Sequence, residues 1–194
     1  MILGITGGMG CGKSTAAAGF ERRGFRRLDT DALVRDGVLA MPDVRAALRE
    51  HFGGAVLHAD GTVDRARLAA EVFPDAAALQ WLEGLVHPRL YELWREAFAA
   101  APDAAWAVEV PLLFEKGLEN WFDFTVCVAS SAPQQLARLE QRGLTRALAE
   151  QRISKQLPLA RKIELADFVL WNDGSAGFLQ EQIDRLIESL AVVR

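Results

Sequence analysis

The residues with the clearest chemistry stand near the amino terminus, in the segment GITGGMGCGKST. The phosphate-loop spacing G-x-x-x-x-G-K-[ST] is matched without a gap by Gly7, Gly12, Lys13 and Ser14. Glycines suit such a loop because its backbone N–H groups must turn inward around phosphate oxygens. The segment therefore predicts a nucleoside triphosphate site in which Lys13 reaches the β- and γ-phosphates and Ser14 ligates Mg²⁺.

We expect the whole loop to bind ATP, helped by the N-terminus of the helix that follows it. The predicted ATP-binding residues of the loop are Gly8, Gly10, Cys11, Gly12, Lys13, Ser14 and Thr15. The sequence leaves two interpretations of Cys11. It is either a small residue that fits the curve of the loop, or a thiol made more acidic by the nearby helix end.

Composition narrows the class of protein around this loop. The chain has 194 residues and a net charge of −4, which predicts one domain and argues against a nucleic-acid partner. Apolar runs are too short to cross a membrane or to form a signal peptide. Two cysteines, Cys11 and Cys127, make neither a disulfide framework nor a zinc site. We therefore expect a cytoplasmic enzyme that is a monomer or a weak homo-oligomer.

The elements that must position the loop form an alternating pattern of strands and helices. Five apolar β-type runs are separated by helical patterns, which predicts an α/β fold with a five-stranded parallel sheet flanked by helices. Helices are expected at about 13–23, directly after the loop, and at about 175–192. The expected strands are 2–6, 25–29, 105–110, 124–129 and 168–172.

A block of mostly helical sequence separates the second and third strands. It is too long for a simple crossover, so we interpret it as an insertion over the carboxyl edge of the sheet. Pro42 starts one helix, which ends at Gly53-Gly54. Pro74 is expected to start a helix that ends near His87, and Pro88 to start another.

A second irregular block, between the fourth and fifth strands, is rich in cations. It is either a solvated helical surface or a mobile lid that closes over phosphates, and we favour the lid. Its cationic residues are Arg138, Arg142, Arg146, Arg152, Lys155, Arg161 and Lys162. The expected organisation is a core of 1–31, 103–137 and 163–194, a helical substrate-binding insertion at about 32–102 and a lid at about 138–162.

The residues that follow the second strand bear on what accepts the phosphoryl group. Asp29 and Asp31 stand at its carboxyl end, and strand alternation would point their side chains the same way. A carboxylate there can orient an acceptor hydroxyl and take its proton late in the transfer. Asp31 can equally be the N-cap of the next helix. The residues alone leave both roles open.

Five motifs together resemble the dephospho-CoA kinase family over nearly the whole chain. They are GITGGMGCGKST, LDTDAL, EVPLLFEKG, RISKQ and ADFVLWNDGS, in that order. The resemblance implies a P-loop kinase fold with a helical substrate-binding region and a helical lid. It also implies the reaction of that family, in which ATP with Mg²⁺ phosphorylates the ribose 3′-hydroxyl of dephospho-CoA to give coenzyme A and ADP.

The resemblance also implies roles for individual residues. Asp31 matches the aspartate that acts as general base. Arg142 resembles a lid arginine that approaches the ATP phosphates, and Arg138 is a weaker candidate one helical turn away. His87 matches a histidine of the substrate-binding region, and either contacts the acceptor or simply ends a helix. Glu115 either places the acceptor or the metal, or is an exposed carboxylate.

Several positions depart from the commoner family pattern, among them Thr30, Met9, Cys11, Glu109 and Trp171. Glu109 stands where an aspartate is usual, so we do not assign it to Mg²⁺. Trp171 is bulkier than the usual aliphatic residue, and core packing is favoured over contact with adenine. The alternative function is another P-loop kinase of a small metabolite or nucleotide. A nucleotide-dependent switch is disfavoured because neither an NKxD nor a suitably placed DxxG motif is present.

Overall fold

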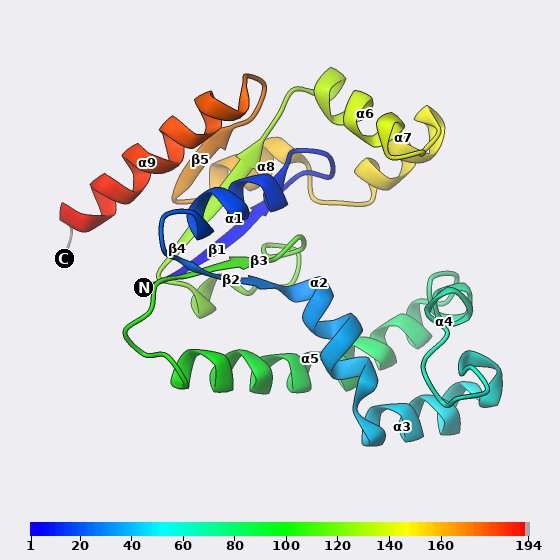
Figure 1. The fold of residues 1–194 in the computed structure, drawn as a ribbon. Coiled ribbons are helices and arrows are strands. Elements are labelled where there is room, and N and C mark those ends of the chain that lie inside the picture. The colour runs from blue at the N-terminus through cyan, green and yellow to red at the C-terminus, as the bar shows by residue number, and fades with distance from the viewer. Residues whose placement is uncertain (193–194) are drawn as a thin grey trace. The chain divides into compact units, whose positions relative to one another are not determined.

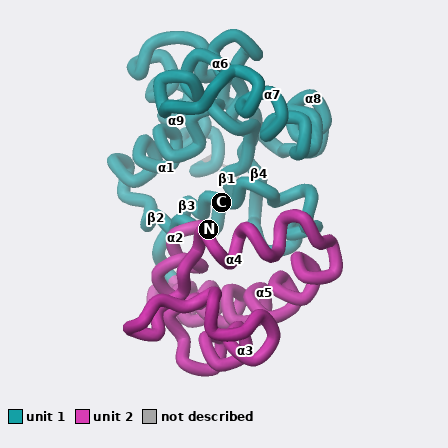
Figure 2. Tube along the Cα trace, turned by 90° about the vertical axis from the view of Figure 1, so that its right-hand side faces the viewer, with its two compact units in different colours: residues 1–29, 103–194 teal, residues 30–102 magenta. Residues whose placement is uncertain are grey.

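The chain forms two compact units in a computed structural model, which describes residues 1–192. One unit contains residues 1–29 together with the chain from residue 103 onward, and the other contains residues 30–102 (Figure 2). The helical insertion expected at about 32–102 lies in the second unit. Among residues 1–192, no helix is both long and apolar enough to span a membrane.

The first unit is built on a five-stranded sheet in the order β2-β3-β1-β4-β5, and every neighbouring pair is parallel (Figure 1). The strands are β1 (Ile2–Gly7), β2 (Arg26–Asp29), β3 (Trp106–Glu109), β4 (Phe124–Ala129) and β5 (Phe168–Trp171). The expected α/β fold and its five strands are confirmed. Because β1 is the central strand, the loop that follows it lies at the middle of the carboxyl edge, where open α/β sheets bind ligands.

Helices cover both faces of this sheet, and β1 shows how the sequence assigns them. On one face, Leu3 and Ile5 are buried in the core with α1 (Lys13–Glu21) and α9 (Ala176–Val192). On the other face, a Cβ at Gly4 would lie 2.8 Å from Leu113, and α8 (Leu159–Leu165) packs against β1 and β4. This alternation along a buried strand fixes which residues face which helices.

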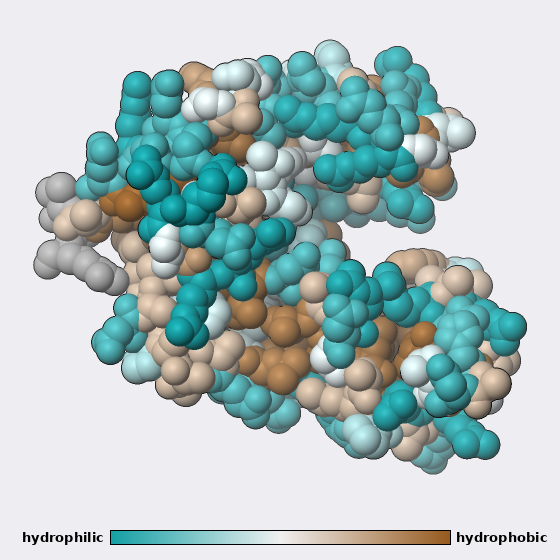
Figure 3. Space-filling view, viewed as in Figure 1, coloured by the Kyte–Doolittle hydropathy of each residue, from teal (hydrophilic) through white to brown (hydrophobic). Residues whose placement is uncertain are grey.

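The cation-rich block consists of α6 (Ala132–Gln141), α7 (Arg146–Ser154) and α8. Thr145 caps α7, because its hydroxyl accepts a hydrogen bond from the Leu148 N–H at 3.4 Å. Side chains over α6 and α7 are mostly hydrophilic in the view of Figure 3. The block therefore keeps its charged residues at the surface along these two helices.

The second unit is entirely helical apart from its connecting segments and one isolated bridge between Leu57 and Val63. A short α2 (Thr30–Ala32) continues into a π-helix (Leu33–Gly37) and a 3₁₀ turn (Val38–Ala40). The longer helices are α3 (Pro42–Phe52), α4 (Arg65–Val72) and α5 (Ala76–Ala99). Figure 3 shows hydrophobic residues gathered over the middle of α5.

The expected break at His87-Pro88 is wrong, because α5 runs through Pro88 without interruption. A proline inside a helix removes one hydrogen bond and crowds the carbonyl of the residue four positions earlier. That residue is Gly84, and both it and Pro88 are exposed, so the released carbonyl can turn toward water. Pro88 is therefore a proline that the interior of α5 tolerates, and it does not mark the start of a new helix.

Candidate active site

The phosphate loop owes its shape to glycines in the left-handed region. Gly10 has φ +80° and Gly12 has φ +92°, conformations that side chains with a Cβ rarely adopt. A Cβ at Gly12 would lie 2.2 Å from Nδ2 of Asn172, and one at Gly10 would lie 2.8 Å from the carbonyl oxygen of Gln135. Glycine is therefore required here for space as well as for backbone conformation.

Lys13, the first residue of α1, folds back over the loop. Its ammonium donates hydrogen bonds to the carbonyl oxygens of Gly7 at 3.2 Å and Gly8 at 3.1 Å. Ser14 and Thr15 follow on the exposed first turn of the helix. A flexible cation over the loop and open hydroxyls at a helix N-terminus suit a bound triphosphate.

The carbonyl oxygen of Cys11 accepts hydrogen bonds from residues that follow two other strands, so it links the carboxyl ends of β1, β4 and β5. Asn172, just after β5, donates to it at 2.9 Å, and Ser130, just after β4, donates at 3.3 Å. Arg138 of α6 donates to the same oxygen at 3.4 Å. Because β1 leads into Cys11, these contacts hold the loop against the ends of its two neighbours on that side of the sheet.

Arg138 makes the widest set of contacts in this network. Its guanidinium also donates to the carbonyl oxygens of Gly10 at 3.2 Å and Asn172 at 2.6 Å, and to Oγ of Ser130 at 2.9 Å. All of these acceptors are protein groups that shape the loop. Sequence reasoning treated this residue as a possible phosphate ligand, whereas here it braces the backbone that forms the phosphate site.

Two glutamines that sequence reasoning missed also touch the loop. The amide of Gln135 is buried and donates to the carbonyl oxygen of Ser130 at 2.9 Å, while its backbone lies against Gly10. The side-chain oxygen of Gln156 accepts a hydrogen bond from the Met9 N–H at 3.1 Å. The motif RISKQ, which ends at Gln156, was the available sequence signal for the second contact.

Ser14 and Glu109 place two oxygen donors side by side. The Ser14 hydroxyl donates to Oε2 of Glu109 at 2.8 Å, from the start of α1 to the end of β3. The other carboxylate oxygen of Glu109 accepts from Arg27, whose Nε lies 2.8 Å away and whose Nη2 lies 2.6 Å away. Glu109 is only 4% exposed, so this ion pair fixes its orientation. Hydroxyl and carboxylate oxygens are the ligands that Mg²⁺ prefers.

Burial decides the chemistry of the loop cysteine. Cys11 is buried, and loss of solvent raises the pKa of its thiol, outweighing the opposing effects of hydrogen bonding and of Lys13. The interpretation of an acidified thiol is therefore wrong. Cys11 acts as a small apolar residue in the core of the loop.

Asp31 lies inside α2, so it belongs neither to the end of β2 nor to the N-cap of a helix, the two positions expected from the sequence. The strand β2 ends at Asp29, so strand alternation does not extend to Asp31. The helix begins at Thr30, one residue before Asp31, so Asp31 does not occupy the N-cap position either. Its side chain is exposed. Its carboxylate therefore stands in the first helical turn after the carboxyl end of β2.

Arg142 and His87 stand apart from the contacts described above. Arg142 is exposed at the C-terminal end of α6, one helical turn beyond Arg138. His87 is half-buried on α5, with its ring centroid 5.9 Å from that of Tyr91.

Glu115 forms an ion pair with a buried lysine. Its Oε1 lies 2.8 Å from Nζ of Lys162, which is 0% exposed, and also accepts from the Leu157 N–H at 3.0 Å. Lys162 donates in addition to the carbonyl oxygen of Pro111 at 2.8 Å. Glu115 is therefore not an ordinary exposed carboxylate.

The expectation that Trp171 packs in the core is wrong, because this residue is 46% exposed. Its neighbour Asn172 is buried and tied to Cys11, so the strand turns the tryptophan outward, toward solvent. Alternation along β5, with Leu170 buried and Trp171 exposed, gives the physical reason.

Comparison with known sequences agrees with these motifs. A family profile described as dephospho-CoA kinase matches residues 1–177. A dephospho-CoA kinase of Thermosynechococcus vestitus is 41% identical over 190 residues, covering 97% of this chain and 94% of that protein. One of Corynebacterium efficiens is 37% identical over 192 residues and covers 97% of this chain and 96% of that protein.

Solved structures share the fold. A protein of Thermus thermophilus matches with a TM-score of 0.87 and 36% identity, covering 98% of this chain and 97% of that chain. A dephospho-CoA kinase from Campylobacter jejuni matches with a TM-score of 0.66 and 23% identity, covering 97% and 96%. Together with the phosphate loop and the matched motifs, these similarities establish that the chain belongs to the dephospho-CoA kinase family, whose members are nucleotide-dependent kinases.

Proposed function

We propose that this chain transfers the γ-phosphoryl group of Mg·ATP to the ribose 3′-hydroxyl of dephospho-CoA, giving coenzyme A and ADP. The observation that carries the proposal is the phosphate loop itself, built on Gly10 and Gly12 and braced by Arg138. It stands in a chain that matches dephospho-CoA kinases over nearly its full length.

The loop and Lys13 bind the triphosphate in this proposal. Lys13 exchanges the carbonyl oxygens of Gly7 and Gly8 for the β- and γ-phosphate oxygens, a small movement of a flexible side chain. Trp171, which is exposed and precedes the loop-binding Asn172, offers a flat apolar surface for adenine.

Ser14 and Glu109 are the residues that would hold Mg²⁺. The ion, when bound, neutralises charge on the β- and γ-phosphate oxygens. Ser14 supplies a direct oxygen ligand, and Glu109 orients that hydroxyl through the 2.8 Å hydrogen bond between them. The sequence predicted Ser14 alone as a Mg²⁺ ligand, and the proposed metal site now also includes Glu109.

Asp31 orients the acceptor hydroxyl and takes its proton as transfer proceeds. Its exposure and its place in the first turn of α2 support this role over capping. Arg142, on the proposed lid, stabilises charge on the transferring group. His87 and Glu115 keep their predicted roles as acceptor-site residues, although the pairing of Glu115 with Lys162 favours positioning over direct contact.

We also propose that the enzyme acts in the cytoplasm on small molecules, as a monomer or weak homo-oligomer and without a nucleic-acid partner. Cys11 and Cys127, both buried free thiols, support a reducing compartment.

Product analysis tests the proposed reaction. The protein is mixed with dephospho-CoA and Mg·ATP, and the position of the new phosphate is found by phosphorus NMR. A new 3′-phosphate on the acceptor supports the proposal. Turnover of a nucleoside monophosphate without turnover of dephospho-CoA would instead support another small-molecule kinase. ATP hydrolysis at one rate with and without acceptor would identify a switch.

A further inference from the structure

A cavity of about 280 Å³ lies entirely within the helical unit of residues 30–102. This volume is close to the lower end of the roughly 300–1,000 Å³ typical of small-ligand sites. Three arginines line it: Arg35 from the π-helix, Arg45 from α3 and Arg65 from the start of α4. Three separate elements therefore contribute arginine residues to the lining of one cavity.

The cationic lining contrasts with the rest of this unit. Residues 30–102 carry seven arginines, no lysine and eleven carboxylates, a net charge of −4. The residues that line the cavity, in contrast, are three arginines and one acidic residue, Asp36, with no other charged residue among them. A local positive charge in a negative unit indicates an anionic ligand.

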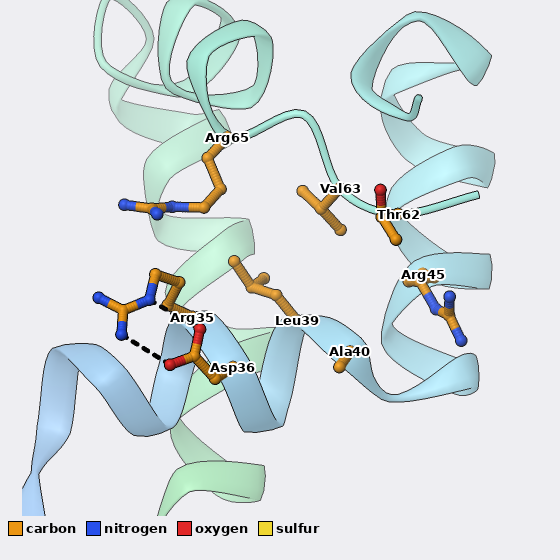
Figure 4. A pocket seen from close by; sticks show the side chains of 8 residues that line it. All are labelled: Arg35, Asp36, Leu39, Ala40, Arg45, Thr62, Val63 and Arg65. Carbon is orange, nitrogen blue, oxygen red and sulfur yellow. Dashed lines mark hydrogen bonds and ion pairs between the residues drawn. The ribbon is translucent and has the colours of Figure 1, made fainter. Parts of the chain in front are cut away.

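Two of these arginines turn their guanidinium groups to the same side of the cavity. In Figure 4 the guanidinium groups of Arg35 and Arg65 lie on one side, whereas that of Arg45 points away. Arg45 instead lies 3.5 Å from the carbonyl oxygen of Gly61. Asp36 is the carboxylate nearest the pair and bonds Arg35 twice, at 2.7 and 2.6 Å.

The position of Arg65 is unfavourable for the helix that carries it. It is the first residue of α4, where the positive end of the helix dipole disfavours a cation. The N-cap, Asp64, pairs with Arg67 at 3.2 Å. Among the described residues 1–192, no carboxylate forms an ion pair with Arg65. Arg65 acts on Asp36 only through its charge, and less strongly than Arg35 does, so its guanidinium can bind an anionic ligand.

The chain also relates this cavity to Asp31. Helical backbone continues from α2 through Ala32 into the π-helix, so Asp31 and Arg35 are one turn apart, about 6 Å along the axis. In dephospho-CoA, the 5′-carbon of the reacting ribose carries a diphosphate. An acceptor whose 3′-hydroxyl lies at Asp31 thus has its diphosphate within the span of one helical turn.

We propose that Arg35 and Arg65 bind the diphosphate bridge of the acceptor. The inference rests on the proposed function, since Asp31 must hold the hydroxyl of the same ribose. Guanidinium groups bind phosphate oxygens through paired, charge-assisted hydrogen bonds. Asp36 competes with the diphosphate for Arg35 in the free protein.

Steady-state kinetics with dephospho-CoA and Mg·ATP tests the assignment. Arg35→Ala and Arg65→Ala should each raise KM for dephospho-CoA about 10-fold to 100-fold, the value of a charge-assisted hydrogen bond. The kcat and the KM for ATP should stay near wild type. Arg65→Lys should lie between wild type and Arg65→Ala. Asp36→Asn should lower KM for dephospho-CoA, because the competing carboxylate is neutralised.

Arg49→Ala is the matched control, since Arg49 is exposed on α3 and does not line the cavity. Its kinetics should equal those of wild type. The melting temperature of Arg65→Ala should equal or exceed that of wild type. An unchanged KM for dephospho-CoA in both alanine variants would overturn the inference and leave the proposed function intact. A general loss of kcat, ATP affinity and melting temperature would assign the arginines a structural role. A wild-type protein that makes no coenzyme A would instead refute the proposed function.

Discussion

The hydroxyl of Ser14 donates to a carboxylate oxygen of Glu109 at 2.8 Å, which joins the end of the phosphate loop to the neighbouring strand β3. Arg27 binds the other oxygen of the same carboxylate. The orientation of the proposed Mg²⁺ ligand therefore depends on a buried ion pair between β2 and β3. A residue that was not assigned from the sequence thus becomes part of the metal-binding apparatus.

Replacing Glu109 by Gln keeps the size of the side chain but removes its charge. We expect activity at low Mg²⁺ to fall about 10-fold to 100-fold, as when the partner of a metal ligand is altered. The measurement is kcat/KM for ATP as a function of Mg²⁺ concentration. Arg27→Gln, which removes only the cationic partner, should lower the melting temperature and weaken the response to Mg²⁺ less than Glu109→Gln does. A wild-type response of Glu109→Gln to Mg²⁺ would show that the carboxylate has no part in metal binding.

Asp31→Asn tests the acid–base role. We expect kcat to fall about 100-fold to 10,000-fold, since loss of a general base removes an effect of that size. ATP affinity, measured by calorimetry, should not change. Asp60→Asn in the same unit, at a turn where Asp60 bonds Thr62, is the control and should keep full turnover. Full activity of Asp31→Asn would return this residue to a structural role.

Alanine variants of Arg138 and Arg142, which lie one helical turn apart, should have different effects. The first should affect stability and the second catalysis. Arg138→Ala removes the hydrogen bonds of the guanidinium around the loop, which should cost about 2 kcal/mol and lower the melting temperature by about 5 °C. Its KM for ATP should rise. Arg142→Ala should keep the wild-type melting temperature and lose about 100-fold or more in kcat. The assignments are reversed if calorimetry and kinetics give the opposite pattern.

Gly12 and Gly24 form a matched pair for the loop. Both have nearly the same positive φ, +92° and +89°, so alanine strains the backbone to a similar extent at each. A Cβ at Gly12 meets Asn172, whereas one at Gly24 meets nothing within 4 Å. Gly12→Ala should therefore abolish ATP binding in calorimetry, while Gly24→Ala should only lower the melting temperature. Equal ATP affinities would show that the tight fit is unimportant.

Cys127 should make the fold sensitive to alkali. Burial raises the pKa of its thiol to about 12, from an ordinary value of 9.0. Between these values the unfolded chain loses the proton more readily than the folded one, so stability falls as pH rises from 9 toward 12. Urea unfolding at a series of pH values measures this slope. Cys127→Ala should give a shallower slope, and an identical slope would assign the effect to other groups.

The parallel sheet was predictable because β1, β3 and β4 are short, mostly apolar and buried runs, whereas β2 is polar and only partly buried. The phosphate loop was predictable because its backbone needs glycine at fixed positions, such as Gly10 and Gly12 with their positive φ angles, and this need is visible in a short stretch of sequence. Pro88 misled the helix assignment because a proline that starts a helix and one tolerated on an exposed face have the same local sequence. Only the surroundings of Gly84 distinguish the two cases.

The hydrogen bonds that brace the phosphate loop could not be predicted from the sequence, because the residues that form them are far apart in the chain. Arg138 contacts Gly10 across 128 positions, and Ser14 contacts Glu109 across 95. Strand order had to be known before the ends of β3, β4 and β5 could be placed around the loop. The hydrophobic periodicity of the sequence predicts the helices and strands. The roles of these side chains depend on which strands are neighbours in the sheet, which periodicity does not reveal.

Two contacts fix the ends of the proposed lid and so define how it can move. Arg138 pins one end to the phosphate loop, and the buried Lys162 pins the other to Pro111. Gln156 and Leu157 are also tied, to Met9 and Glu115, so a closing motion is confined to residues 139–155. The lid should behave as a flap hinged at both roots, so that α7 in its middle travels farthest while the sheet beneath it stays still.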